Sequence, residues 1–295
     1  MRYIRACFVG AVVGFTLGTF VVTDNALRPP RALPLQSSAA DTVARNTGSK
    51  WESAEVTAPD GVLLKAWLFS PFKPNGSAVI LLHGVADTRL GMLSHATFLL
   101  RNGFTVLLPD FRGHGESGGQ IITYGVKEAG DLHGWADWLL QDHSLNRLYG
   151  LGQSMGAAIL LESLPTEQRF RAVVADSAFD TFEEISYDRL GQVLRMPRLV
   201  FWPMIHGGFI YARLRYGVDL SHASPDHAIR ETHIPVLLIH GTRDTNIPPR
   251  HSRELHVANP AITQLWLVPG AEHVASLSLN PDVYLRTVTN WFMSH

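Results

Sequence analysis

Short apolar runs rich in valine, leucine and isoleucine recur along the chain from residue 78 onward. Continuous runs of this kind, without polar alternation, are typical of strands buried on both faces of a sheet. Helical patterns lie between them, as in residues 127–141, where Leu132, Trp135 and Leu139 fall on one face. The runs are 78–84, 104–110, 148–152, 171–177, 235–241 and 264–270. Buried strands that alternate with helices predict a doubly wound, mostly parallel α/β sheet.

Two segments depart from this alternation. Residues 51–69 hold two strand-like runs around Pro59, Asp60 and Gly61, which predicts a hairpin. Residues 180–232 have no buried-strand pattern and are rich in aromatic side chains and arginines. Because a structureless loop of this length is uncommon in a compact domain, we expect a helical cap inserted over the sheet at about 180–232. A plain pair of core helices is the alternative.

The N-terminal segment has its own composition. Arg2 and Arg5 precede an uncharged run from Ala6 to Val22, which is at the short end of what spans a bilayer. Residues 1–25 are therefore expected to be a signal anchor or a signal sequence. We favour an uncleaved anchor because no small-residue cleavage site follows the run, and a core helix is the remaining alternative. The proline-containing residues 26–50 predict a tether.

The globular part of the chain is expected at 51–295. It is expected on the outer side of a membrane to which the N-terminus is attached, because the positive charges precede the apolar run. Secretion after cleavage is the alternative location. The membrane and a small-molecule substrate are then the expected partners.

The charge balance and the cysteine count exclude several classes of function. The chain has 25 Lys+Arg against 26 Asp+Glu, which excludes the basic footprint of a nucleic-acid-binding protein. Cys7 is the one cysteine, so no intrachain disulfide can form. The 14 histidines show no metal-ligand spacing. We therefore expect no metal and no organic cofactor.

A serine lies between two glycines at residues 152–156, Gly-Gln-Ser-Met-Gly, after a predicted strand and before a predicted helix. G-x-S-x-G in this context makes a bend too sharp for large flanking side chains. It would raise the Ser154 hydroxyl at the carboxyl end of the strand, beside helix N–H groups that suit an oxyanion. The motif by itself is short, and small residues also pack at ordinary strand–helix turns.

A serine hydroxyl needs an oriented base to become a nucleophile. Asp244 follows the run 235–241, and His273 follows the run 264–270. With Ser154, the chain order is serine, aspartate, histidine. On these residues the sequence resembles the α/β-hydrolase superfamily, close to its monoacylglycerol-lipase-like and serine-aminopeptidase-like branch, from residue 51 to the C-terminus. The resemblance implies catalytic roles for all three residues.

Two further segments match the pattern of that superfamily. Residues 81–84, Leu-Leu-His-Gly, resemble its loop after the third strand, and residues 109–119 resemble its glycine-rich loop after the fourth. The resemblance implies that the backbone N–H groups of Val85 and Met155 form the oxyanion hole. The first loop is short and lacks the triple glycine of many esterases.

Other polar residues compete for these roles. Asp176 and Asp180 follow the preceding strand and could supply the acid. His83 and His114 lie in glycine-rich loops and are expected to shape them, whereas His240 lies within a strand and is expected to be a hydrogen-bonded core group.

The predicted function is hydrolysis of carboxylic ester or related acyl bonds through an acyl-enzyme, on a substrate with a hydrophobic group that suits the aromatic cap. An aminopeptidase is the alternative, in which Glu183, Glu184 or Asp188 would bind a substrate ammonium. A non-catalytic, membrane-tethered binding protein on a hydrolase fold is the alternative of another class.

Overall fold

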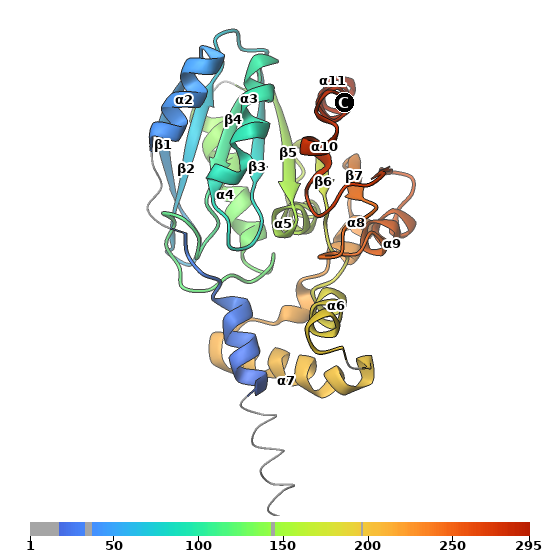
Figure 1. The fold of residues 1–295 in the computed structure, drawn as a ribbon. Helices are drawn as coiled ribbons and strands as arrows, with labels where there is room; N and C mark the ends of the chain where they lie inside the picture. Colours follow the sequence, from blue (N-terminus) through green and yellow to red (C-terminus); the bar gives the residue numbers. More distant parts are fainter. Residues whose placement is uncertain (1–17, 33–36, 143–144, 196) are drawn as a thin grey trace, which may run out of the picture.

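The computed structural model describes residues 18–32, 37–142, 145–195 and 197–295. Its centre is one eight-stranded sheet in the order β1-β2-β4-β3-β5-β6-β7-β8 (Figure 1). Strands β1 and β2 form the expected antiparallel hairpin, β2 pairs antiparallel with β4, and the remaining neighbours are parallel. The strands are β1 (Lys50–Thr57), β2 (Leu63–Ser70), β3 (Ser77–Leu82), β4 (Thr105–Pro109), β5 (Arg147–Gln153), β6 (Phe170–Asp176), β7 (Val236–Gly241) and β8 (Thr263–Val268). The doubly wound α/β architecture is therefore confirmed.

Helices cover both faces of the sheet and create two hydrophobic cores. Strand β3 shows why the central runs are continuously apolar, since Ala78, Ile80 and Leu82 enter one core while Val79 and Leu81 enter the other. One core is closed by α2 (Ser37–Thr47), α3 (Leu93–Arg101) and α11 (Pro281–Ser294), and the other by α4 (Glu128–Asp142), α5 (Met155–Ser163), α8 (Pro225–Glu231) and α9 (Arg250–Ala258).

Strand β8 differs from the expectation of a strand buried on both faces. It is one of the two edge strands of the sheet, with Gln264 exposed and residues 265–267 only half-buried. An edge strand has one neighbour instead of two, so its side chains are less covered than those of β7. The apolar composition of the run could not distinguish these two positions.

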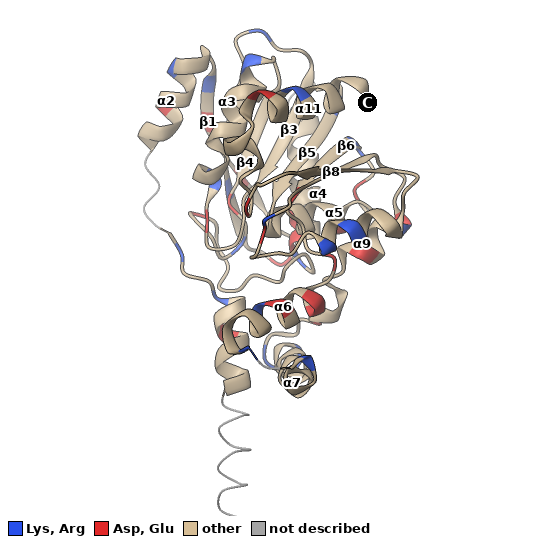
Figure 2. Cartoon of the chain, turned by 45° about the vertical axis from the view of Figure 1, so that its right-hand side comes forward, with Lys and Arg blue, Asp and Glu red and all other residues tan. Residues whose placement is uncertain are grey.

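Helices occupy the segment between β6 and β7, where the sequence predicts a cap. Helices α6 (Phe182–Leu194) and α7 (Arg198–Tyr216) lie beyond the carboxyl ends of the parallel strands, at the lower end of the molecule in Figure 1. A short helix η2 (Leu220–His222) and α8 lead back to the sheet. Acidic and basic residues are interspersed along the chain in Figure 2, in keeping with the near-zero net charge.

Part of the predicted tether is helical and packed. Helix α2 lies within residues 26–50, and its Ala40 and Val43, three positions apart, are buried against the sheet layer. The Asp41 carboxylate accepts a hydrogen bond from Trp51 Nε1 at 2.9 Å. Residues 37–47 thus differ from the expected free linker because their small apolar face contributes to a core.

The expected membrane anchor is not supported by the described residues. Among them, no helix is both long enough and apolar enough to cross a bilayer. Residues 1–17, which carry most of the predicted anchor, lie outside the described part of the chain. Residues 18–27 are helical and lie beside α7 (Figure 1). Attachment to a membrane and the domain boundaries given above remain predictions.

Candidate active site

Ser154 lies between the end of β5 and the first residue of α5, in a strained backbone conformation. Its φ is 55° and its ψ is −121°, a region that residues with a side chain seldom adopt. The backbone N–H of Ser154 donates to the carbonyl oxygen of Asp176 at 2.9 Å, which fixes the bend to the neighbouring strand β6. The strain is thus held in place by the sheet.

The two glycines that flank Ser154 are required by close backbone contacts. A Cβ atom on Gly156 would lie 2.5 Å from the carbonyl oxygens of Leu82 and His83 at the end of β3. A Cβ atom on Gly152 would overlap the backbone of Gly156. Neither position can carry a side chain while α5 approaches the sheet this closely. This agrees with the expectation from the motif that the bend is too sharp for large flanking side chains.

The side chains of Ser154, His273 and Asp244 form a continuous hydrogen-bonded chain. His273 Nε2 lies 3.0 Å from Ser154 Oγ, and His273 Nδ1 lies 2.7 Å from Asp244 Oδ2. The other carboxylate oxygen, Asp244 Oδ1, accepts hydrogen bonds of 2.9 Å from the backbone N–H groups of Asn246 and Ile247. The structure therefore brings together the three side chains that the sequence singles out.

Asp244 is buried, and its pKa is set by two opposing effects. Burial by itself raises the pKa of this carboxyl, but hydrogen bonds to His240 and His273 outweigh burial and hold the pKa well below its usual value. The ionised carboxylate can then orient the imidazole and stabilise its cationic form. His240 also lies 2.6 Å from Ser252 Oγ, so it is the hydrogen-bonded core group that was expected.

The loop after β3 lies directly beside the serine. A Cβ atom on Gly84 would be 3.5 Å from the Cβ of Ser154, and Val85 and Met155 line the same cavity as Ser154. The backbone N–H of Phe111 donates to His83 Nε2 at 3.2 Å, so His83 Nδ1 donates to the carbonyl oxygen of Gly84 at 2.7 Å. Burial lowers the pKa of His83 to about 4, which keeps this imidazole neutral. His83 therefore shapes the loop, as expected.

His114 supports the same loop from the other side. The backbone N–H of Ala86 donates to His114 Nε2 at 3.2 Å, and His114 Nδ1 is 3.1 Å from the carbonyl oxygen of Arg112. Burial lowers the pKa of His114. Both loop histidines thus fix backbone and do not contact the Ser154 hydroxyl.

An apolar cavity of about 530 Å³ opens above Ser154. Its walls come from the cap helices α6 and α7, from residues 18–27 and from the loops around the serine. Apolar lining residues include Phe179, Phe182, Ile185, Met204, Phe209 and Ile247. The cavity can hold a hydrophobic group with one polar end at the serine, as ligand sites of this type do.

The competing aspartates make other contacts. Asp176 is buried beside Ser177 Oγ and the Tyr284 hydroxyl, which donate to its two oxygens at 3.1 and 3.2 Å. Burial raises its pKa to about 6. Asp180 Oδ1 lies 2.7 Å from His251 Nδ1. Both carboxylates thus have partners other than His273.

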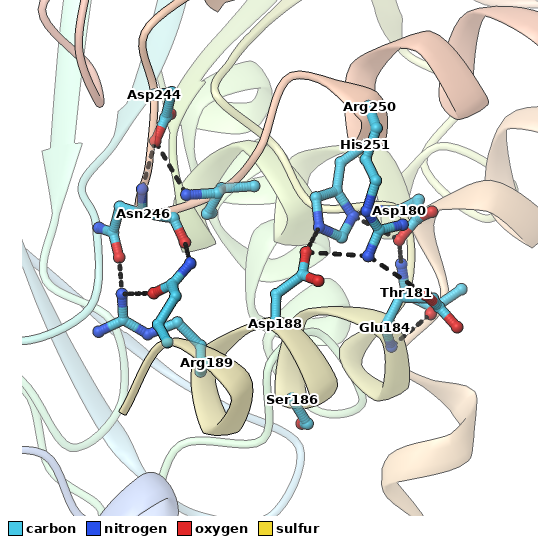
Figure 3. A network of polar contacts seen from close by, with 12 residues as sticks. Asp180, Thr181, Glu184, Ser186, Asp188, Arg189, Asp244, Asn246, Arg250 and His251 are labelled. Carbon is cyan, nitrogen blue, oxygen red and sulfur yellow. Dashed lines mark hydrogen bonds and ion pairs between the residues drawn. The ribbon is translucent and has the colours of Figure 1, made fainter. Parts of the chain in front are cut away.

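A polar network joins α6 to α9 (Figure 3), and no motif in the sequence predicts it. His251 lies between Asp180 and Asp188, with Nε2 2.9 Å from Asp188 Oδ2, and Arg250 donates to the same oxygen at 2.9 Å. Burial lowers the pKa of His251, but the hydrogen bonds with the two aspartates outweigh it and raise the pKa overall. Arg250 also contacts Glu184 at 3.2 Å.

Helix α6 is also hydrogen-bonded to the loop that carries Asp244. Arg189 donates to the side chain of Asn246 (Figure 3). Gln192 Nε2 donates to the carbonyl oxygen of Thr245 at 2.7 Å. The cap is therefore attached to the loop that orients the imidazole. Within the part of the chain that the structure describes, no group of three or more His, Cys, Asp or Glu residues could hold a metal ion.

Comparisons with known proteins place the chain in one family. Residues 77–200 match the family described as alpha/beta hydrolase fold. Uncharacterized protein YqkD of Bacillus subtilis is 31% identical over 215 residues, which are 72% of this chain and 70% of YqkD. A monoacylglycerol lipase of Mycolicibacterium smegmatis is 28% identical over 271 residues, 80% of this chain and 94% of the lipase. The esterase Pf2001 of Pyrococcus furiosus shares the fold with a TM-score of 0.73 at 24% identity, over 91% of this chain and 99% of the esterase. The chain belongs to the α/β-hydrolase family.

Proposed function

We propose that the protein is a serine hydrolase that cleaves carboxylic esters of hydrophobic acyl groups. One observation carries the proposal, namely the hydrogen-bonded chain from Asp244 through His273 to Ser154 at the base of an apolar cavity. Two similar proteins, a monoacylglycerol lipase and an esterase, support ester bonds as the target.

In the first half-reaction, Ser154 Oγ attacks the ester carbonyl carbon while His273 Nε2 removes the hydroxyl proton. The ionised Asp244 holds His273 in the orientation that leaves Nε2 facing the serine and stabilises the imidazolium that forms. The backbone N–H groups of Val85 and Met155 would donate to the oxyanion of the tetrahedral intermediate, where each donor is worth about 3–4 kcal/mol. The intermediate collapses when His273 returns the proton to the departing alcohol oxygen.

In the second half-reaction, water replaces the alcohol. His273 removes a proton from this water as its oxygen attacks the acyl-enzyme carbonyl. The second tetrahedral intermediate uses the same two N–H groups, and it collapses when the proton returns to Ser154 Oγ. The carboxylic acid product leaves and the serine is regenerated.

The aminopeptidase alternative is less well supported by the cap. Glu184 and Asp188, two of the acids that could bind a substrate ammonium, are already engaged by Arg198, Arg250 and His251. The cavity above Ser154 is lined mostly by apolar side chains. An apolar wall favours an acyl or alkyl group over a charged amine.

Replacing the serine tests both the reaction and the alternative of a non-catalytic binding protein. The Ser154→Ala variant should lose about 10⁴-fold or more of its kcat on p-nitrophenyl butyrate. It should also lose covalent labelling by a fluorophosphonate probe, which reacts only with an activated serine. Ser163→Ala is the matched control, since Ser163 is the last residue of α5, the helix that follows Ser154, and its hydroxyl donates to the carbonyl oxygen of Leu160 at 2.7 Å. Unchanged turnover in Ser154→Ala would refute the assignment.

A further inference from the structure

The helix formed by residues 18–27, here called the N-terminal helix, contributes directly to the cavity above Ser154. Val22, Thr23 and Ala26 line this cavity. Positions 22 and 26 are one helical turn apart, so they present a single face of the helix to it. Val21 and Asn25 belong to a neighbouring, solvent-exposed stripe. A segment in which the sequence predicts the end of a signal anchor or signal sequence and the start of a tether therefore forms part of the candidate substrate site.

Small residues allow the N-terminal helix to approach α7 closely. A Cβ atom on Gly208 would lie 2.5 Å from Thr23 Oγ1, and one on Gly207 would lie 3.4 Å from Thr19 Cγ2. The Thr23 hydroxyl donates to the carbonyl oxygen of Thr19 at 2.9 Å, so it is satisfied within its own helix. The glycine pair in α7 thus has a structural purpose, which is to let the N-terminal helix close this side of the cap.

Polar contacts hold the helix in this position from two sides. The hydroxyl groups of Tyr211 and Tyr216, both on α7, donate to Asp24 Oδ1 at 3.1 and 2.6 Å. On the other side, the Tyr124 hydroxyl donates to the carbonyl oxygen of Ala26 at 2.8 Å. These side chains come from the cap and from the loop before α4, so the N-terminal helix joins the two.

The C-terminal end of the helix is also attached to the sheet domain that the cap covers. The backbone N–H of Ile122 donates to the carbonyl oxygen of Leu27 at 2.9 Å, and the Leu27 side chain is fully buried. Burial of a leucine contributes about 2 kcal/mol. The helix is therefore fixed at its C-terminal end by a core side chain and along its length by hydrogen bonds.

We propose that the N-terminal helix is a specificity-determining wall of the active site, which limits the length of the acyl group through Val22 and Ala26. The inference rests on the proposed function because the selectivity concerns the ester cleaved at Ser154. A larger side chain at either position would take space from the cavity while leaving the catalytic side chains untouched. The same enlargement at the neighbouring exposed positions would not.

The test compares matched substitutions in the full-length chain. Ala26→Phe and Val22→Phe should lower kcat/KM for p-nitrophenyl dodecanoate about 10-fold or more relative to p-nitrophenyl butyrate. Asn25→Phe and Val21→Phe should leave this ratio within about twofold of wild type. Val22 is 42% exposed, so Val22→Phe should fold even where Ala26→Phe does not, and thermal unfolding of each variant verifies the fold.

The possible outcomes separate this inference from the proposed function. If folded phenylalanine variants of an active enzyme keep the wild-type ratio of kcat/KM for dodecanoate to kcat/KM for butyrate, the N-terminal helix does not determine acyl length. The proposed hydrolase activity is then unaffected. A wild type without turnover on any ester overturns the hydrolase, and the wall is then tested by calorimetric titration with dodecanoate. In that titration Ala26→Phe or Val22→Phe must weaken binding about 10-fold relative to Asn25→Phe. Equal affinities, or no binding to the wild type, overturn the wall.

Discussion

Replacing Asp176 with asparagine should stabilise the protein at neutral pH and leave its chemistry intact. The carboxyl is fully buried at the end of β6, where burial raises its pKa from 3.8 to about 6. Asparagine has nearly the same shape and no charge. Its side-chain oxygen can accept from Ser177, and the Tyr284 hydroxyl can accept from its amide as readily as it donates to the carboxylate.

The sign of the effect follows from the direction of the pKa shift. Between pH 3.8 and 6 the folded state binds a proton more tightly than the unfolded state. The stability contributed by Asp176 is therefore fully present below about pH 3.8 and is lost as the pH rises through about 6. At about 1.4 kcal/mol per pKa unit, the whole loss is about 3 kcal/mol, of which about 2 kcal/mol falls between pH 4.5 and 8.

Urea unfolding at pH 4.5 and pH 8 measures this loss. The free energy of unfolding of Asp176→Asn, relative to wild type, should rise by about 2 kcal/mol between the two pH values. Turnover of p-nitrophenyl butyrate at pH 8 should be retained in Asp176→Asn, whereas Asp244→Asn should lose about 10⁴-fold. A pH-independent difference in stability would refute the reasoning on burial. Loss of turnover in Asp176→Asn but not in Asp244→Asn would reverse the assignment of the acid.

Two further predictions concern the bend at Ser154 and the attachment of the cap. Gly156→Ala should lower the free energy of unfolding by about 2–3 kcal/mol because its Cβ would lie 2.5 Å from backbone carbonyl oxygens. Gly134→Ala is the control and should raise the free energy of unfolding by about 0.5–1 kcal/mol, since a Cβ there has no neighbour within 4 Å. Urea unfolding measures both variants, and similar losses of stability in the two would contradict the prediction. The pKa of His251 is raised in the folded state, so its contribution to stability is fully present below about pH 6.5 and is lost as the pH rises through the folded-state pKa. The wild type should therefore lose stability over this pH range, and His251→Gln should not show this loss. Thermal midpoints from pH 6 to 9 should fall less in the variant than in wild type. Parallel plots of thermal midpoint against pH would argue against a protonated His251 between Asp180 and Asp188.

The central part of the sheet could be predicted from the sequence because its strands are buried on both faces. Residues 78–82, Ala-Val-Ile-Leu-Leu, have no polar position to place in water, so a parallel sheet covered by helices on both faces is the arrangement that buries them. The position of a strand within the sheet is a different matter. Residues 265–268 are also apolar, yet β8 is an edge strand, and the composition of the run does not show how many strands pair with it.

The candidate site was accessible to sequence reasoning because strand ends converge. Ser154, Asp244 and His273 each follow a parallel strand, and the carboxyl ends of parallel strands meet at one edge of the sheet. The network around His251 was not accessible for the opposite reason. Its partners lie on α6, α9 and the segment after β6, and their contacts depend on how the cap is seated, which no spacing in the sequence encodes.

The N-terminal helix shows that an uncharged apolar segment is compatible with two environments, the interior of a bilayer and the surface of another helix of the same protein. An uncharged run that ends at Val22 has the composition of a membrane segment, and composition alone gave no reason to separate its last turns from the rest. The residues that indicate packing against α7 are far apart in the sequence. They are Thr19 and Thr23 on one helix and Gly207 and Gly208 on the other, and their contacts become visible only when both helices are placed in the structure. Asp24, two residues past the end of the run, accepts hydrogen bonds from two tyrosines of α7, which attach this segment to the protein. A charged residue at the end of an apolar run, with tyrosines in a later helix, is therefore reason to test packing against the protein before assuming packing against lipid.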